Sequence, residues 1–247
     1  MTSARNRGFI MKLSAPVHRL KRQAKDLSRV DKIPLHVALD RIAQGEGFAT
    51  WALLASRLSA ESVGLELLAK FEPGNLVLVG SRPNQGKTMK ALELVVRAVQ
   101  SGQRGWFFSL EWTLHDLLRG LEKLGANAAD LVDRFEFDCA DGLCARYIIE
   151  RLADAPRGSV VVVDYLQLLD QKREHPELAV QVRALKDFAG DRGLIVVLLS
   201  QIDRSYDPGV SVVPTLGDVR LPNPLNLLMF DKACFLHDGV VEVLAVS

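Results

Sequence analysis

The sequence predicts an α/β fold in which a mostly parallel central sheet has helices on both faces, with a small helical segment in front of it. Between residues 12 and 58, apolar residues recur at spacings of three and four, which is typical of amphipathic helices. From residue 76 onward, short apolar runs alternate with helical patterns, as in β-α units. The run at 160–163 consists only of valines, and such a strand is buried on both faces, as in a parallel sheet.

Three helices are expected in the N-terminal segment. The first extends from about Leu13 to Leu27, where apolar residues mark one face. Pro34 suits the first turn of the second helix. Two glycines then interrupt the pattern, and Thr50 can cap a third helix that continues to about Leu58.

The remainder of the chain alternates between strands and helices. Strands are expected at 76–79, 105–110, 134–137, 160–163 and 194–200. Helices are expected at 89–100, 113–124, 144–153 and 177–191. The segments 232–236 and 240–245 predict a hairpin, because the pair Asp238-Gly239 between them favours a tight turn.

The composition is that of an ordinary globular protein. Of the 247 residues, 48% are hydrophobic and 25% are charged. The three cysteines lack the spacing and the histidine partners of a metal site, so we expect reduced thiols. The chain has no apolar run of roughly 20 residues and no secretory signal pattern. We therefore expect a cytoplasmic protein without a membrane partner.

Positive charge is concentrated at the start of the chain. Residues 1 to 32 contain nine Lys and Arg residues against Asp26 and Asp31, although the net charge of the whole chain is only +1. This asymmetry favours an anionic partner. A solvated helix face explains the charge equally well, and both interpretations remain open at this point.

The strongest motif is the phosphate loop Ser81-Arg82-Pro83-Asn84-Gln85-Gly86-Lys87-Thr88. It follows an apolar strand and precedes a helix, which is the context that such a loop requires. Backbone N–H groups at the start of the helix would surround the phosphates of ATP, because a helix N-terminus attracts anions. Lys87 would bridge the terminal phosphates, and the Thr88 hydroxyl would bind Mg²⁺.

Three polar residues end other apolar strands, which is where ligands bind in open α/β sheets. Asp164 follows the valine run and is the candidate Mg²⁺-binding carboxylate, although it could instead cap the next segment. Glu111 could polarise the water that attacks the γ-phosphate. Gln201 could hydrogen-bond the γ-phosphate and sense its loss, or it could contact only solvent.

Together these segments resemble the RecA-like ATPase core of DnaB-type replicative helicases. The matching stretches are the phosphate loop, 107–111, 163–169, 199–201 with Arg204, and 218–220. The Arg-Pro pair inside the phosphate loop and the string Asp-Tyr-Leu-Gln at 164–167 are far more specific than a generic phosphate loop. The resemblance covers about residues 72 to 237.

The resemblance implies a RecA-like P-loop NTPase fold that uses ATP and Mg²⁺. It implies that Glu111 activates water, that Asp164 is the Walker B carboxylate and that Gln201 senses the γ-phosphate. Lys87 completes the expected catalytic set, and Arg204 is added to the expected nucleotide-binding residues. In domain terms, we expect a disordered 1–11, a basic helical module at 12–70 and a DnaB-type ATPase domain at 71–247.

The same comparison reveals departures from the family. DnaB-type helicases carry a larger N-terminal domain and a C-terminal hairpin whose arginine finger reaches the nucleotide of the neighbouring subunit. In this chain no Lys or Arg follows Lys232. Such a finger can raise the rate ~10³-fold or more, so its loss predicts slow hydrolysis. Arg204 or Arg220 could substitute, or a second copy or a protein partner could supply the arginine.

Two functions are compatible with the sequence. The first is an ATPase that acts on or near DNA, with basic N-terminal residues contacting single-stranded DNA. The second is a nucleotide-dependent loader, regulator or stress-system binding module with slow or no turnover. Only Arg204 and Arg220 are basic between Gln201 and Asp231, where such helicases place DNA-contacting loops. The sequence therefore does not predict strand separation.

Overall fold

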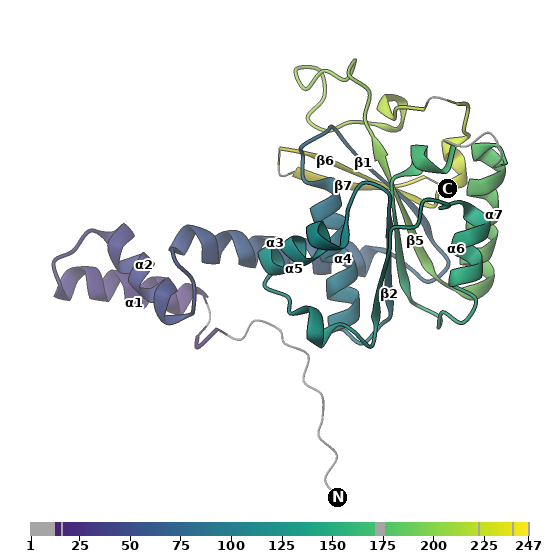
Figure 1. The fold of residues 1–247 in the computed structure, drawn as a ribbon. Helices are drawn as coiled ribbons and strands as arrows, with labels where there is room; N and C mark the ends of the chain where they lie inside the picture. The colour runs from purple at the N-terminus through teal and green to yellow at the C-terminus, as the bar shows by residue number, and fades with distance from the viewer. Residues whose placement is uncertain (1–12, 16, 171–175, 222, 239, 247) are drawn as a thin grey trace, which may run out of the picture. The chain divides into compact units, whose positions relative to one another are not determined.

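The computed structural model describes residues 13–15, 17–170, 176–221, 223–238 and 240–246, without the side chains of 56–63, 65, 168 and 170 (Figure 1). The chain divides into two compact units, one up to Gly64 and one from Leu65 onward. The disorder predicted for 1–11 falls outside the described residues. Within the described part of the chain, no helix combines the length and the apolar character needed to cross a membrane.

The first unit begins with two helices that pack against each other. Helix α1 (Val17–Val30) and helix α2 (Leu35–Gly45) form this pair. Leu20 and Ala24, two of the apolar positions that predicted the first helix, are buried. The opposite side of α1 is rich in charged residues and faces solvent.

Helix α3 (Trp51–Lys70) begins where the sequence predicts it. The Thr50 hydroxyl accepts a hydrogen bond from the Leu53 N–H (3.2 Å), which is the expected N-terminal cap. The helix is longer than predicted, because it continues from Leu58 to Lys70. No proline interrupts this stretch and most of its residues are good helix formers, so the backbone has no reason to stop earlier.

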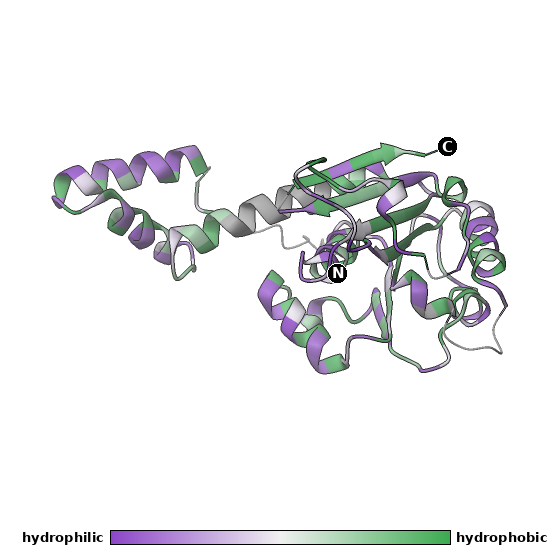
Figure 2. Cartoon of the chain, turned by 90° about the horizontal axis from the view of Figure 1, so that it is seen from above, coloured by the Kyte–Doolittle hydropathy of each residue, from purple (hydrophilic) through white to green (hydrophobic). Residues whose placement is uncertain are grey.

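Among the described residues of the second unit, seven strands form one sheet in the order β3-β2-β4-β5-β1-β6-β7. The strands are β1 (Leu76–Ser81), β2 (Gly105–Ser109), β3 (Phe135–Asp138), β4 (Val160–Asp164), β5 (Ile195–Gln201), β6 (Lys232–His237) and β7 (Val240–Ala245). All neighbouring strands are parallel except β6 and β7, which form the predicted antiparallel hairpin. Figure 2 shows that the strands are largely hydrophobic, as expected for a covered sheet.

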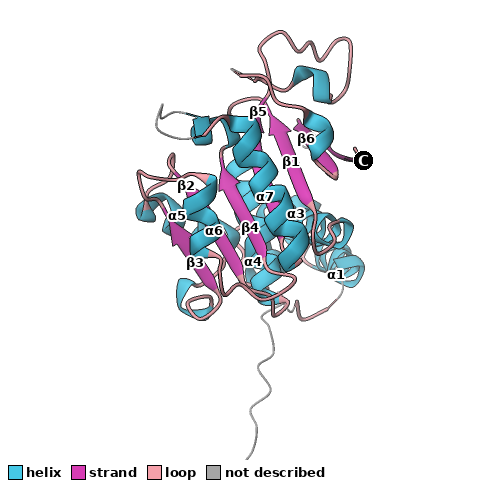
Figure 3. Cartoon of the chain, turned by 90° about the vertical axis from the view of Figure 1, so that its right-hand side faces the viewer, coloured by secondary structure: helices cyan, strands magenta, loops and turns pink. Residues whose placement is uncertain are grey.

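Helices cover both faces of this sheet, which confirms the predicted fold class (Figure 3). The helices are α4 (Lys87–Gln100), α5 (Leu114–Leu124), α6 (Ala145–Arg151) and α7 (Leu178–Arg192). Short 3-10 helices occur at Ala128–Asp130, Leu166–Asp170, Leu216–Asp218 and Leu227–Met229. Helix α4 packs on one face with α5 beside it, whereas α6 and α7 pack together in the core of the other face.

Strand β1 lies between β5 and β6, and every one of its residues is buried. Its alternate residues Leu76 and Leu78 belong to the core beneath α6 and α7. Because β1, β2, β4 and β5 are parallel, their carboxyl ends meet at one edge of the sheet. The loops that follow these strands therefore gather at the same edge, where open α/β sheets bind ligands.

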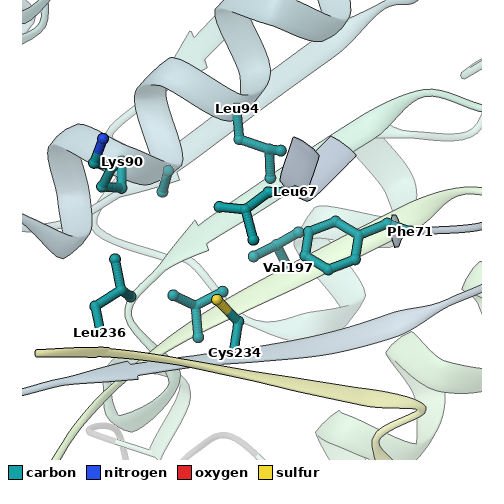
Figure 4. Close-up of a pocket in the computed structure, with 9 residues that line it drawn as sticks. Leu67, Phe71, Lys90, Leu94, Val197, Cys234 and Leu236 are labelled. Atoms are coloured by element: carbon teal, nitrogen blue, oxygen red, sulfur yellow. The ribbon is translucent and has the colours of Figure 1, made fainter. Parts of the chain in front are cut away.

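A small apolar cavity lies within the second unit (Figure 4). It is lined by Leu67, Phe71, Val79, Lys90, Ala91, Leu94, Val197, Cys234 and Leu236. Lys90, the only charged residue of the lining, pairs with Glu93 at 3.2 Å. Burial raises the pKa of the Cys234 thiol to about 12, so this cysteine packs as a neutral apolar side chain. We assign the cavity to packing of the end of α3 on α4 and the sheet.

Candidate nucleotide-binding site

The phosphate loop connects the end of β1 to the start of α4. Strand β1 ends at Ser81, and α4 begins at Lys87. Between them, Asn84 has a φ of 64° and Gly86 has a φ of 76°. This left-handed backbone is the reason that position 86 is a glycine, since side chains rarely tolerate it. The turn leads into the N-terminus of a 14-residue helix, where free N–H groups attract anions.

Lys87 lies at the junction of three strand ends. Its Nζ donates a hydrogen bond to the backbone carbonyl of Ser200 (3.3 Å) and stands 5.3 Å from the centroid of the Tyr165 ring. Burial lowers the pKa of the Lys87 ammonium, while the negative charges of Asp164 and, less strongly, Glu111 raise it. A half-buried ammonium in this setting is stabilised by an anionic ligand.

Asp164 ends β4 and is 1% exposed. Neither carboxylate oxygen has a hydrogen-bond partner among the described residues. Burial raises the pKa of Asp164 to about 6, against the opposing effects of the Lys87 charge and the Thr88 hydroxyl. The Thr88 hydroxyl is near enough to lower this pKa but is not placed to make a regular hydrogen bond to either oxygen. The peptide bond between Asp164 and Tyr165 is cis.

The donor set at Asp164 fits a magnesium ion. Mg²⁺ prefers oxygen ligands and is usually held by one or two carboxylates together with substrate phosphates. Asp164 offers a buried carboxylate without a partner, and Thr88 offers a hydroxyl beside it. In the described part of the chain, no group of three or more His, Cys, Asp or Glu could hold a metal alone. The carboxylate and the hydroxyl together would supply two oxygen ligands, as Mg²⁺ sites at phosphates commonly use.

Glu111 follows β2 at the same edge of the sheet. The Ser109 hydroxyl accepts hydrogen bonds from the N–H groups of Glu111 (3.2 Å) and Trp112 (3.1 Å), which fixes the turn after the strand. The Glu111 side chain is exposed, and its charge raises the pKa values of both Lys87 and Asp164. The structure therefore places it within electrostatic range of both residues, open to solvent.

Gln201 ends β5 directly beside Ser81 of β1. Its backbone carbonyl accepts a hydrogen bond from the Arg220 N–H (2.9 Å). Residues 218–220, where the sequence resembles an Asp-Leu-Arg segment, thus run along the end of β5. Arg204 lies further on with an exposed side chain, and the contact that it makes with the phosphate loop is through its backbone carbonyl.

Two side chains of the phosphate loop contact protein rather than open space. Arg82 donates hydrogen bonds to the carbonyls of Arg204 (2.9 Å) and Tyr206 (2.5 Å). Gln85 exchanges hydrogen bonds with Asp238. These contacts engage Arg82 Nη2 and the amide group of Gln85, and a role of either residue in binding the nucleotide stays a prediction.

Sequence reasoning missed several residues that the fold brings to this edge. Gln167 donates hydrogen bonds from its amide to the Ser200 hydroxyl (2.9 Å) and to the Arg220 carbonyl (2.6 Å), joining the ends of β4 and β5. The specific string Asp-Tyr-Leu-Gln contains both Gln167 and Tyr165, so this motif could have indicated them. Nothing in the sequence indicated Asp238, because its partner Gln85 lies 153 residues away.

Comparison with protein families and curated proteins gives a consistent result. The sequence model described as DnaB-like helicase C terminal domain matches residues 141–223. A "Probable plasmid replicative DNA helicase" of Chlamydia trachomatis is 27% identical over 184 residues, covering 62% of this chain and 40% of the relative. The "Replicative DNA helicase DnaB" of Helicobacter pylori strain 26695 is 28% identical over 181 residues, with coverages of 61% and 37%. The chain thus spans about two fifths of these relatives.

Solved structures share the fold. One solved ATPase domain matches with a TM-score of 0.55 and 21% identity, over 68% of this chain and 70% of that chain. A DnaB-like replicative helicase, solved in a study of its interactions with primase, matches with a TM-score of 0.59 and 18% identity, over 93% and 70%. At these identities the likeness establishes architecture only.

The fold and the phosphate-loop edge place the second unit among P-loop proteins with a RecA-like core. Within that class, the core resembles the DnaB type, since the family match, the curated relatives and the structural neighbours agree. The resemblance expected from the sequence motifs is therefore confirmed.

Proposed function

We propose that this chain binds ATP with Mg²⁺, hydrolyses it, and acts on or near DNA as a DnaB-like protein. The buried Asp164 carboxylate carries this proposal, because it has no hydrogen-bond partner among the described residues and lies beside Lys87 and Thr88. A buried charge without a partner is costly, so the site favours a cation as its ligand. The adjoining phosphate loop makes the Mg²⁺ of a nucleotide the simplest choice.

Each residue at the edge has a role in this proposal. When bound, Mg²⁺ would offset the negative charge of the phosphates. Thr88 and Asp164 would hold the ion, and the Lys87 ammonium would exchange the Ser200 carbonyl for a phosphate oxygen. Glu111 would polarise the attacking water, because its carboxylate is exposed to the solvent that supplies this water. Gln201 would sense the γ-phosphate from the end of β5.

The first unit offers a surface for the DNA part of the proposal. Lys21, Lys25 and Arg29 follow each other at intervals of four residues on α1, so they form one stripe, and Arg22 lies beside it. All four side chains are exposed. Because each residue of a helix rises about 1.5 Å, successive cations of this stripe are roughly 6 Å apart along the helix. A row of cations at regular spacing can pair with the regularly spaced phosphates of a nucleic-acid strand. We propose that this basic stripe contacts single-stranded DNA.

The proposal also needs a cation for the transition state. Arg204 and Arg220 contact the phosphate loop and the strand end through their backbone groups, and both side chains are exposed. We propose that a second copy of the chain or a protein partner supplies an arginine to the site, as a finger acting in trans. Turnover by the isolated chain would then be slow and would rise on assembly.

An ATPase assay tests the proposal. Wild-type protein, Lys87→Ala and Glu111→Gln are compared with and without single-stranded DNA, with Arg146→Ala as a control on an exposed helix face. We expect turnover that is lost in Lys87→Ala, reduced in Glu111→Gln and unchanged in the control. Equal turnover in wild type and Lys87→Ala would rule out the proposed ATPase activity. Tight ATP binding without turnover, with or without DNA, would instead support a nucleotide-dependent loader or regulator.

A further inference from the structure

The phosphate loop is fastened to two distant segments by its own side chains. Both hydrogen bonds from Arg82 leave the same nitrogen, Nη2, and end on the carbonyls of Arg204 and Tyr206. The guanidinium also lies 5.4 Å from the centroid of the Tyr206 ring, which adds cation–π attraction. The Gln85 amide donates to Asp238 Oδ1 (3.4 Å), and the Asp238 N–H donates to Gln85 Oε1 (3.0 Å).

These two anchors are connected to each other. The Tyr206 and His237 rings meet edge to face, with centroids 5.4 Å apart, and His237 precedes Asp238 in the chain. Tyr206 is 3% exposed, and its hydroxyl donates to the Ser211 carbonyl (2.8 Å), which closes the segment 206–211. A continuous series of contacts therefore runs from one side of the phosphate loop to the other.

An arginine is suited to the first anchor for a geometric reason. Its guanidinium is planar and presents two hydrogens on one nitrogen in fixed directions, as two neighbouring carbonyls require. A lysine ammonium is a compact point charge that lacks this fixed pair of directions and stacks less well on an aromatic ring. Nη2 of the Arg82 guanidinium is thus engaged by the two carbonyls.

We propose that Arg82 is a positioning residue that fastens the phosphate loop to residues 204–206 and so holds the loop in its phosphate-binding shape. The inference rests on the proposed nucleotide binding. Asn84 and Gly86 both have left-handed backbones, and such conformations persist where the surrounding structure imposes them. Arg82 and Gln85 impose this shape from the two sides of Pro83-Asn84.

The first test needs no nucleotide. Trypsin cuts after Arg204, and cleavage there requires the segment to open. Without Arg82, the Arg204 carbonyl loses its hydrogen bond, so we expect cleavage after Arg204 to be about tenfold faster in Arg82→Ala. Arg82→Lys should show an intermediate rate and Arg146→Ala the wild-type rate. Mass spectrometry of the fragments gives the rates, and equal rates in Arg82→Ala and wild type would overturn the tether.

The second test is a double-mutant cycle on nucleotide affinity, measured by fluorescence of a labelled ATP analogue. Arg82→Ala and Tyr206→Leu should each weaken binding by roughly tenfold, and the double variant should be little weaker than either, since both disrupt one tether. Arg82→Lys should recover part of the affinity. If Arg82 bound phosphate directly, its effect would be the same with or without the Tyr206→Leu change, and this additivity would refute the positioning role.

The outcomes for the proposed function and for the tether are separable. If wild-type protein bound no nucleotide, the proposed function would fail, while the cleavage rates at Arg204 would still decide whether Arg82 fastens the segment. If wild-type protein bound nucleotide and Arg82→Ala left both affinity and cleavage unchanged, only the tether would be refuted. Should Arg82→Ala unfold, as seen by circular dichroism, Arg82→Lys and Tyr206→Leu supply the same comparison.

Discussion

The Lys87 ammonium donates a hydrogen bond to the Ser200 carbonyl, 3.3 Å away on the neighbouring strand. The hydroxyl of the same serine accepts a hydrogen bond from the Gln167 amide. The lysine of the phosphate loop therefore rests on a neutral acceptor at the point where strands β1, β4 and β5 end. A neutral carbonyl is a weaker partner for an ammonium than an anionic phosphate oxygen, so the lysine is held in place and still available for exchange.

The buried Asp164 carboxylate should reduce the stability of the nucleotide-free protein at neutral pH. Its pKa of about 6 in the folded protein exceeds the ordinary value of 3.8. The folded state thus holds the proton more tightly, and this stabilisation is complete below about pH 4 and is lost as the pH rises through about 6. We expect Asp164→Asn to raise the free energy of unfolding by roughly 2 kcal/mol at pH 8 and by little near pH 4. Urea unfolding without Mg²⁺ measures this, with the exposed Asp191→Asn as control.

The same carboxylate should make magnesium-dependent nucleotide binding sensitive to acid. The Asp164 proton must leave before the oxygen can bind a cation, so affinity for a magnesium–nucleotide complex should fall as the pH drops through about 6. The expected slope is about tenfold per pH unit below that point. Isothermal titration calorimetry between pH 5 and 8 measures it. A titration with EDTA in place of Mg²⁺ should lack this slope; an equal slope in both would place the titrating group elsewhere.

Glu111→Gln should separate binding from turnover. The Glu111 side chain is exposed and its charge acts on Lys87 and Asp164, so removing the charge leaves the phosphate loop intact. We expect nucleotide affinity within about threefold of wild type and turnover lower by roughly 10²-fold or more, the range for a lost general base. Stopped-flow binding and steady-state phosphate release measure the two quantities. Unchanged turnover would assign water activation to another group.

Neutralising the basic stripe on α1 should weaken DNA binding and reduce its salt dependence. The triple variant Lys21→Gln, Lys25→Gln, Arg29→Gln removes up to three phosphate contacts. The slope of log K against log salt should become shallower by about 2, at roughly 0.7 per contact for single strands. Fluorescence anisotropy with a labelled oligonucleotide measures the slope. The control variant replaces three residues of the second unit that are also exposed, Lys123, Arg146 and Arg183. An equal loss of DNA affinity in this control would show that the basic stripe has no specific role in DNA binding.

Gly105 should be intolerant of any side chain, although it lies at the start of β2, at the opposite end of that strand from the phosphate-loop edge. A Cβ at this position would be 2.4 Å from Val95 Cγ1 and 3.0 Å from Val99 Cγ2 on α4. Gly105→Ala should therefore lower the free energy of unfolding by about 1–3 kcal/mol, as overpacking does. Gly190→Ala on α7, where a Cβ would meet nothing within 4 Å, should be neutral or stabilising by up to ~1 kcal/mol. Urea unfolding of the two variants makes the comparison.

The sheet was predictable from the sequence because its strands are buried on both faces. The valine run of β4 and the apolar run of β1 admit few other interpretations, and parallel strands place their carboxyl ends together. The sequence alone therefore assigns Asp164 and Glu111 to one edge. The hairpin of β6 and β7 followed from one Asp-Gly pair.

The orientation of the loop side chains could not be predicted. The partners of Arg82 are 122 and 124 residues away, and the partner of Gln85 is 153 residues away. Local pattern carries no information about such contacts, so Arg82 and Gln85 could only be counted with the phosphate ligands. The length of α3 was missed for a different reason. Its second half has no apolar stripe that would mark a helix, although its backbone is suited to one.

The position of β1 has a consequence for how the protein is made. Its two neighbours in the sheet, β5 and β6, begin at Ile195 and Lys232, well over a hundred residues after β1 itself. On the ribosome, β1 leaves the exit tunnel long before either partner exists, and contacts so distant in sequence form slowly. The hydrogen bond between Gln85 and Asp238 also forms only after Asp238, near the end of the second unit, has been synthesised. The edge of the sheet at the end of β1 is thus among the last parts of the second unit to mature, because its contacts are complete only once Asp238 has been made.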